Sequence, residues 1–183
     1  EDGEILVKGE NVMLGYYKNA EQTAENITEG FFHTGDIGEL DAEGFLKITD
    51  RKKEIFKTSG GKYVSPQLIE NQLKLSRFIE NAMVVGEGEK MPAAIIQLNF
   101  PFVKEWARRH NLKIGNTNAE IAKNEEVHNR VAQEVERVNR HLGKWEQVKL
   151  FDFTPDEWTI DEGLLTPTLK LKRRVIKEKY IDI

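Results

Sequence analysis

Residues 49–66 read TDRKKEIFKTSGGKYVSP, and they separate two parts of the chain that differ in their pattern of apolar and turn residues. Before this stretch, short apolar runs alternate with Gly-containing turns, which is typical of strands and hairpins. Inside it, Ser65 followed by Pro66 predicts a helix start, with Ser as N-cap and Pro at the first helical position. After it, helical and strand-like patterns are mixed. The stretch therefore predicts a boundary near Asp50 in an α+β chain.

The charge distribution changes at the same place. The chain has 183 residues and a formal net charge of −4. Residues 1–50 carry 12 acidic and 3 basic side chains, whereas residues 51–183 carry 19 acidic and 24 basic ones. A basic half can mark a nucleic-acid module, but both halves also show regular apolar patterning, and no aromatic side chain is interleaved with the basic ones at 170–174. We therefore expect two differently built parts and no nucleic-acid partner.

Composition excludes several classes of protein. The absence of Cys excludes a disulfide framework, a zinc–thiolate site and a cysteine nucleophile. The four histidines show no ligand spacing, so no metal site is expected in this chain. No apolar run approaches the roughly 18–20 residues that span a bilayer. The opening residues 1–4 lack Met and any signal-like segment, so we expect a cytoplasmic chain excised from a longer one.

The first part reads as β-rich. We expect a strand over 4–9, a short helix over 19–26, and two strands over 36–40 and 45–49. Between the two strands, Asp at the first and Gly at the last position of a four-residue turn predict a hairpin. This part is too small to be a domain alone, so we expect it to be marginally packed and to belong to another, larger domain.

The second part, residues 51–183, reads as a small α+β domain. Its apolar runs predict a three-stranded sheet and a further short strand, and Gly86 to Pro92 reads as a hairpin loop. The expected strands cover 54–58, 81–86, 93–98 and 148–153, and the expected helices begin at Pro66 and cover 101–110, 118–123, 125–142 and 172–180.

Two polar clusters suit a sugar or a phosphate. Asp36 follows a Gly at the mouth of a strand, where a carboxylate could accept hydrogen bonds from the vicinal hydroxyls of a ribose. The alternative is an ordinary turn aspartate that caps a nearby N–H group. Arg51 could reach ribose or phosphate oxygens with its planar guanidinium. The alternative is an exposed charged connector, which would also suit a hinge.

Two further clusters lie in the second part. Gly60 and Gly61 would let the backbone approach a ligand closely, and the alternative is a tight turn; the pattern is not a Walker A loop. Lys170, on a Thr-Pro loop before a basic helix, could bring a cation to a developing negative charge. The alternatives for the segment from Lys170 to Lys179 are a solvated basic tail and a peripheral contact with a membrane surface.

In this order, the clusters resemble the C-terminal motif series of the adenylate-forming superfamily, which includes acyl-CoA synthetases, nonribosomal-peptide adenylation domains and firefly luciferase. The resemblance covers essentially the whole chain. The segments that carry it are GEILVKG at 3–9, VMLGYY at 12–17, EQT at 21–23, FHTGD at 32–36 and the stretch from Asp50 to Pro66.

The resemblance implies roles for six positions that precede Lys170. Asp36 would hold the ribose hydroxyls of adenosine, and Arg51 would make a second ribose contact. Lys53 stands where the family places its hinge residue. Lys57 would lie on the face turned toward the second half-reaction, where the loop of Gly60 and Gly61 would approach the pantetheine arm of CoA.

Lys170 aligns with the lysine that assists adenylation, and Lys172 is a competing candidate. Many members have Gly before that lysine, whereas this chain has Leu169. A larger residue there, and the long insertion over 101–144, resemble the long-chain fatty acid–CoA ligase branch. The implied substrates are a fatty acid, ATP with Mg²⁺, and coenzyme A.

The resemblance also implies what is missing. The chain has no phosphate loop rich in Ser, Thr and Gly and no Y-G-x-T-E motif, so we expect it to form no acyl-AMP alone. The alternatives left open are an aryl-CoA ligase, a luciferase-like enzyme, a carrier-loading adenylation domain, and a non-catalytic module on the same fold. Nothing in the sequence specifies an oligomer.

Overall fold

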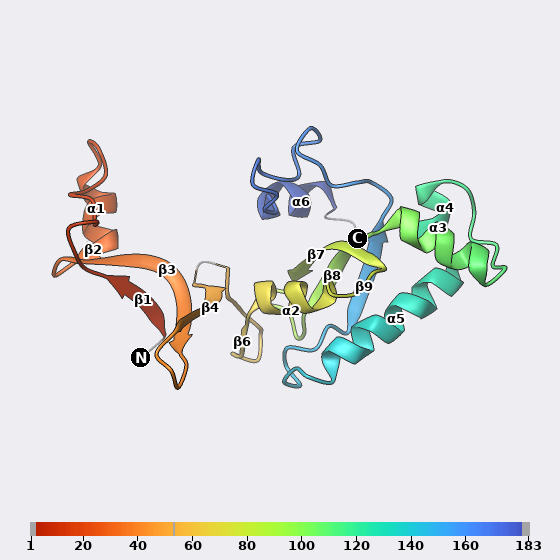
Figure 1. Ribbon diagram of the computed structural model, residues 1–183, viewed down its shortest axis with the longest axis horizontal. Helices are drawn as coiled ribbons and strands as arrows, with labels where there is room; N and C mark the ends of the chain where they lie inside the picture. The colour runs from red at the N-terminus through yellow and green to blue at the C-terminus, as the bar shows by residue number, and fades with distance from the viewer. Residues whose placement is uncertain (1–2, 53, 181–183) are drawn as a thin grey trace. The chain divides into compact units, whose positions relative to one another are not determined.

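A computed structural model describes residues 3–52 and 54–180. The chain forms two compact units, which join in the sequence between Ile55 and Phe56, a few residues beyond the position predicted near Asp50. We call them unit 1 and unit 2 and describe each by itself (Figure 1). The assignment of unit 1 to a larger domain stays a prediction.

Unit 1 is built on one long strand. β3 runs from Phe31 to Leu40 and pairs antiparallel with all three other strands of a four-stranded sheet (Figure 1). It is longer than the predicted strand over 36–40, because residues 31–35 pair with β1 and β2. The other elements are β1 (Glu4–Val7), α1 (Ala20–Asn26), β2 (Ile27–Thr28) and β4 (Leu46–Arg51).

Unit 1 does not close around an apolar core. None of its residues at 3–49, 51–52 and 54–55 is buried. Large apolar side chains are instead exposed on the sheet and the loops: Leu14, Tyr17, Leu40, Phe45, Leu46 and Ile48. This agrees with the expectation that the segment is marginally packed within this chain.

Unit 2 is the predicted α+β domain with a three-stranded sheet. β8 (Ala93–Leu98) lies at the centre, antiparallel to β7 (Ile79–Val85) and parallel to β9 (Leu150–Thr154). A two-stranded hairpin precedes it. The remaining elements are β5 (Phe56–Lys57), β6 (Tyr63–Val64), α2 (Pro66–Leu73), α3 (Phe100–Arg109), α4 (Asn118–Ala122), α5 (Glu125–Asn139) and α6 (Arg173–Lys179).

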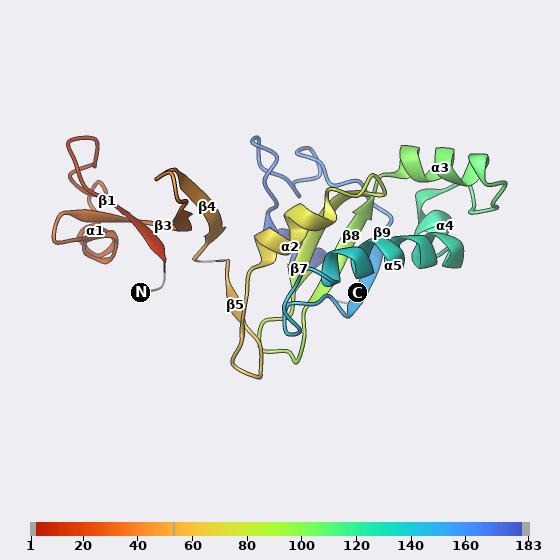
Figure 2. The ribbon, with the colours of Figure 1, turned by 60° about the horizontal axis from the view of Figure 1, so that its bottom comes forward.

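Apolar side chains cover both faces of this sheet. Along β7, Ala82 and Val84 face a large core that α2 and α5 complete, while Met83 faces the opposite side. Figure 2 shows α2 and α5 lying over the strands of this sheet. The second, smaller core is closed by residues of the C-terminal segment: Trp158, Leu164, Leu165, Ile176 and Tyr180. The two cores make unit 2 a self-contained scaffold.

Three predicted boundaries were wrong, each for a local reason. The strand expected over 54–58 is two residues long, because only Phe56 and Lys57 pair with β6. The helix expected to reach residue 142 ends at Asn139, and the strand expected from Val148 begins at Leu150. The Asn139 side chain explains both differences, because it donates to the Val148 carbonyl and accepts from the Val148 amide at 2.9 Å each.

Candidate functional site

The two residues predicted to hold a ribose lie side by side on neighbouring strands. Asp36 of β3 and Arg51 of β4 are register partners, and Arg51 Nε donates to Asp36 Oδ1 at 2.9 Å. The side chains are 25% and 50% exposed, so a ligand can reach both. Within residues 3–52 and 54–180, no side chain donates to the other carboxylate oxygen of Asp36. That oxygen is available to a hydroxyl pair.

The backbone irregularity within β3 just before Asp36, called the Gly35 turn below, depends on glycine. Gly35 has φ +72°, a left-handed conformation that costs other residues energy, although a Cβ there would meet nothing within 4 Å. The Thr34 hydroxyl donates to the Ile5 carbonyl at 2.8 Å and accepts from the Asp36 amide at 3.1 Å. The Gly35 carbonyl accepts from the Lys52 amide at 2.8 Å. Hydrogen bonds with β1 and with Lys52 therefore fix the position of the backbone at Asp36.

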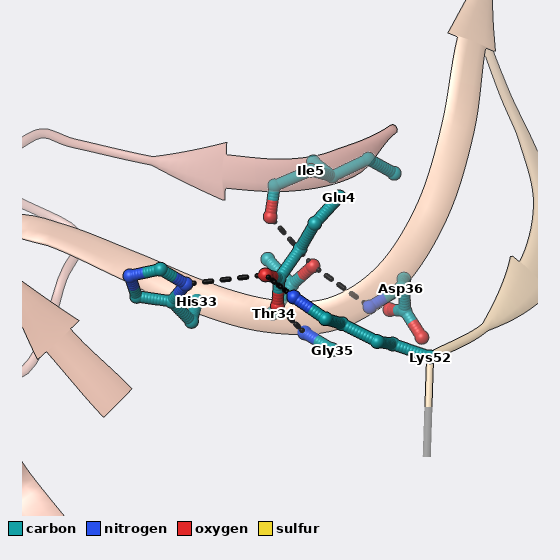
Figure 3. A network of polar contacts seen from close by, with 7 residues as sticks. All are labelled: Glu4, Ile5, His33, Thr34, Gly35, Asp36 and Lys52. Carbon is teal, nitrogen blue, oxygen red and sulfur yellow. Dashed lines mark hydrogen bonds and ion pairs between the residues drawn. The ribbon is translucent and has the colours of Figure 1, made fainter. Parts of the chain in front are cut away.

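Glu4 lies at the centre of this network, a role that was not predicted for it (Figure 3). Its carboxylate accepts from Lys52 Nζ at 2.7 Å and from the Gly35 amide at 3.1 Å, and lies 3.2 Å from His33 Nδ1. Its side chain is only 7% exposed. Glu4 thus ties β1 to the turn that presents Asp36 and to the end of β4.

The surroundings of Glu4 keep it ionised. The hydrogen bond from Lys52 lowers the pKa of Glu4 most, and the contacts with His33 and the Gly35 amide lower it further, while burial acts in the opposite direction. A cleft of about 400 Å³ opens beside it, lined among others by Phe32, Gly35 and Arg51. Asp36 is not among the residues that line this cleft.

In unit 2, the two predicted glycines form the tip of the β5–β6 hairpin. Gly61 has φ +76°, and its amide donates to the Thr58 carbonyl at 2.9 Å. Gly60 has no left-handed conformation, and a Cβ there would meet nothing nearer than the Thr58 hydroxyl at 3.9 Å. The fold of this chain therefore requires glycine at 61 and does not require it at 60.

Lys57 begins this hairpin and is exposed. Its ammonium lies 5.3 Å from the centre of the Tyr63 ring, a cation–π distance. Its backbone carbonyl accepts from Gly88, and the Ser59 amide donates to the Glu89 carbonyl, both at 2.9 Å. The hairpin is thus fastened to the loop between β7 and β8.

Lys170 lies on a short closed loop. Its carbonyl accepts from the Thr166 amide at 2.8 Å, and its amide donates to the Thr166 hydroxyl at 3.1 Å. An isolated bridge between Leu165 and Leu171 closes the base. Leu169 has φ +59° and is 66% exposed, which explains why glycine suits this position.

Lys170 and Lys172 are alike in their side chains and differ in their backbone contacts. Both side chains are exposed, and neither ammonium has a partner among residues 3–52 and 54–180. They differ in backbone role, because Lys170 stands in the loop while Lys172 is the N-cap of α6 and donates its amide to the Leu164 carbonyl at 2.9 Å. Lys172 is therefore held to the scaffold more directly.

An ion pair fixes the end of this loop to the scaffold. Arg173, the first residue of α6, donates through both terminal nitrogens to the two carboxylate oxygens of Glu70 at 2.7 Å each. Glu70 also accepts from the Val84 amide at 2.7 Å, and its side chain is 6% exposed. The two residues are 103 positions apart, so only the fold could reveal the pair.

Lys53, the predicted hinge residue, lies outside the described residues. The described residues contain no group of three or more His, Asp or Glu side chains that could hold a metal ion. Among the same residues, no helix is both long and apolar enough to cross a membrane.

Comparison with known proteins gives one family. Residues 53–150 match the family described as AMP-binding enzyme C-terminal domain. The chain is 38% identical over 180 residues to the long-chain-fatty-acid–CoA ligase FadD15 of Mycobacterium tuberculosis, covering 98% of this chain and 30% of that protein. It is 37% identical over 185 residues to human long-chain-fatty-acid–CoA ligase 1, covering 98% and 26%.

Among solved structures, the chain resembles the adenylation domain of a carboxylate reductase from Mycobacterium chelonae. The TM-score is 0.80 at 25% identity, and the match covers 98% of this chain and 26% of that one. The chain therefore spans less than a third of the length of these curated relatives and of this structural neighbour.

Proposed function

We propose that this chain, which belongs to the family of AMP-binding enzyme C-terminal domains, supplies the C-terminal part of a long-chain fatty acid–CoA ligase. One observation carries the proposal: the chain is 38% identical, over both units, to a protein named for that activity. The proposed reaction has two steps. A fatty carboxylate first attacks ATP to give acyl-AMP and pyrophosphate, and the thiol of CoA then displaces AMP.

For the nucleotide, we propose that Asp36 accepts hydrogen bonds from the ribose hydroxyls while Arg51 donates to ribose or phosphate oxygens. Their 2.9 Å ion pair supports this role, because it presents a carboxylate oxygen and guanidinium N–H groups at one place. The contacts of Glu4, which hold the Gly35 turn, support a fixed position for Asp36. Fixed donors and acceptors bind with little loss of conformational entropy.

For the first step, we propose that Lys170 places its ammonium beside the negative charge that develops on the phosphoryl oxygens. The closed loop from Thr166 to Lys170 and the Arg173–Glu70 pair behind it support a preorganised position. For the second step, the hairpin tip of Gly60 and Gly61, with Lys57, would face the pantetheine arm, and Lys53 would serve as the hinge.

Mg²⁺ would accompany ATP and neutralise part of its phosphate charge. The described residues of this chain contain no cluster of His, Asp or Glu side chains that fits the ion, so none of them is assigned a part in binding it.

The test is a chimera in which this chain replaces the 30% of FadD15 that it matches. We expect ATP–pyrophosphate exchange with a long-chain fatty acid, and none from the 183-residue chain alone. Lys170→Ala should lower the adenylation rate by roughly a hundredfold or more, the usual effect of losing one such contact. Lys172→Ala, the matched control, should leave most of the rate. Turnover by the chain alone, or full activity of Lys170→Ala, would show the proposal to be wrong.

A second candidate is an adenylation domain that loads a carrier protein. The TM-score of 0.80 with a carboxylate reductase domain favours keeping it. In the chimera and in the complete polypeptide, the choice of thiol separates the two functions. A ligase forms a thioester with free CoA, whereas a carrier-loading domain requires a phosphopantetheinylated protein.

A peripheral membrane contact would have to use the basic C-terminal helix. Three of its cations are already paired: Arg173 with Glu70, Arg174 with Glu178 and Lys179 with Asp156. We therefore expect at most weak, salt-sensitive sedimentation with anionic vesicles.

A further inference from the structure

A row of three polar side chains crosses the sheet of unit 2. Asn81 of β7 pairs in register with Gln97 of β8, and Gln97 pairs with Thr154 of β9. They are 8%, 4% and 0% exposed. The neighbouring row on the same face, with Met83 and Ile95, is apolar and belongs to the second core. Burying polar groups costs free energy unless hydrogen bonds compensate it, so the row calls for an explanation.

The hydrogen bonds along this row have a fixed direction. Lys74 Nζ donates to Asn81 Oδ1 at 3.1 Å, and Asn81 Nδ2 donates to Gln97 Oε1 at 2.8 Å. An ammonium group can only donate, so Asn81 must turn its oxygen toward Lys74 and its nitrogen toward Gln97. Gln97 must then turn its oxygen toward Asn81. The amide nitrogen of Gln97 is left at the end of the series with its N–H donors.

These donors face a cleft. Among the described residues, none accepts a hydrogen bond from Gln97 Nε2, and no enclosed side-chain nitrogen or oxygen lacks a partner. The Gln97 amide nitrogen is therefore not fully enclosed, although the residue as a whole is only 4% exposed. Gln97 lines a cleft of about 640 Å³ together with Asn81 and Lys74. The neighbouring Thr154 hydroxyl already accepts from the Trp158 indole N–H at 3.1 Å.

We propose that this cleft is a binding site for an uncharged carbonyl compound, whose oxygen accepts from the amide nitrogen of Gln97. Two carboxylates, Glu80 and Glu157, line the cleft against one ammonium, that of Lys74, and the excess negative charge disfavours an anion. Pro101 and Leu169 provide apolar surface for the body of the ligand. The proposal rests on unit 2 alone and does not depend on the proposed function.

The cleft lies beside the loop that carries Lys170. Leu169 stands directly before Lys170 in the closed loop, so an occupant of the cleft would touch the loop that carries this lysine. An amide carbonyl could come from pantetheine or from a peptide segment. Both share the same acceptor on a small, uncharged body.

The test uses the whole 183-residue chain labelled with ¹⁵N. The probe is N,N-dimethylacetamide, which has a carbonyl acceptor and no donor. We expect a saturable shift of the Gln97 side-chain NH₂ signal, with a dissociation constant in roughly the millimolar range for so small a ligand. No shift of that signal would contradict the site.

Asn81→Asp tests the direction of the hydrogen bonds. An ionised Asp cannot donate to Gln97, so the Gln97 amide should turn over and present its oxygen to the cleft. The shift with dimethylacetamide should disappear, and ethylammonium, a donor, should shift the signals instead. Asn99→Asp is the control for added charge in the same cleft, because it keeps an oxygen for the N-cap bond to Phe102 and loses only an exposed hydrogen bond to Glu80. A dimethylacetamide shift that survives in Asn81→Asp would overturn the proposal.

Two competition arms identify the source of the carbonyl. Pantetheine and N-acetylleucine methylamide are each added to the complex with dimethylacetamide. Displacement by either supports the site and names the ligand class. If neither displaces the probe, the assignment of the natural ligand to an amide carbonyl of pantetheine or of a peptide segment is wrong.

Discussion

The two units of this chain hold their structure by different means. In unit 1, no residue with a described side chain is buried, and polar contacts around Glu4 join β1, β3 and β4. In unit 2, two apolar cores cover both faces of the sheet. The difference teaches that the predicted nucleotide residues stand on a sheet held by hydrogen bonds, whereas the lysine-bearing loop stands on a packed scaffold.

The largest expected effect comes from shortening one leucine in each unit. Leu98 is 1% exposed, so Leu98→Ala should lower the free energy of unfolding by about 3–4 kcal/mol. Leu46 is 54% exposed, and Leu46→Ala should change it by less than about 0.5 kcal/mol. The described tryptophans lie in unit 2, so urea unfolding by fluorescence follows that unit, and amide hydrogen exchange follows unit 1. Equal losses at both positions would remove the contrast.

The next effect concerns the buried ion pair. Glu70→Gln leaves the Arg173 guanidinium without its carboxylate, which should cost unit 2 about 3 kcal/mol in the same fluorescence experiment. Glu178→Gln is the matched control, because its pair with Arg174 joins side chains 63% and 91% exposed. It should cost no more than about 0.5 kcal/mol. A small loss for Glu70→Gln would mean that α6 holds its place without the pair.

A smaller effect is the pH dependence of the stability of unit 1, which Glu4 should cause. The pKa of Glu4 is lowered in the folded state, so its contribution to stability is present above the ordinary glutamate pKa and is lost as pH falls through the lowered value. The protection factors of amides in β1 and β3, which correct for the slower intrinsic exchange in acid, should therefore fall as the pH drops below about 4.5. Glu4→Gln should weaken unit 1 at pH 7 and flatten this pH dependence. Glu39→Gln, in an exposed pair with Lys47, should change neither.

The smallest effect compares the two glycines of the hairpin tip. Gly61→Ala forces alanine into φ +76° and should cost about 1 kcal/mol. Gly60→Ala meets nothing within 3.8 Å of its Cβ and should be close to neutral. A loss of CoA binding in the Gly60→Ala chimera, with stability unchanged, would show that a ligand approaches there. Calorimetric titration with CoA measures it, and strong destabilisation by Gly60→Ala would contradict the geometry.

Local signals in the sequence predicted much of unit 2. Pro66 begins α2 as expected, whereas α3 begins at Phe100, one residue before the expected Pro101, with Asn99 as an N-cap that accepts from the Phe102 amide at 3.0 Å. The α+β class and the three-stranded sheet were confirmed. The parallel pairing of β8 with β9 could not be read, because three helices separate the strands and periodicity carries no information on direction.

The candidate site was only partly predictable. Asp36 and Arg51 were both singled out, and the structure brings them into contact. The first half of β3 was not predicted as strand, because the Gly35 turn chemistry concealed a pairing between His33 and Leu6. Glu4 was missed for a similar reason, since its partner Lys52 is 48 positions away.

Under the proposed function, helix α2 bears on how mutations should affect the two half-reactions. It begins shortly after the glycine hairpin, and its Glu70 forms an ion pair with Arg173, three residues beyond Lys170. Damage to either loop should therefore impair one chemical step and spare the other. Loosening the helix should degrade acid activation and thioester formation together, so a paired defect in a random mutant screen would map to α2 and its contacts.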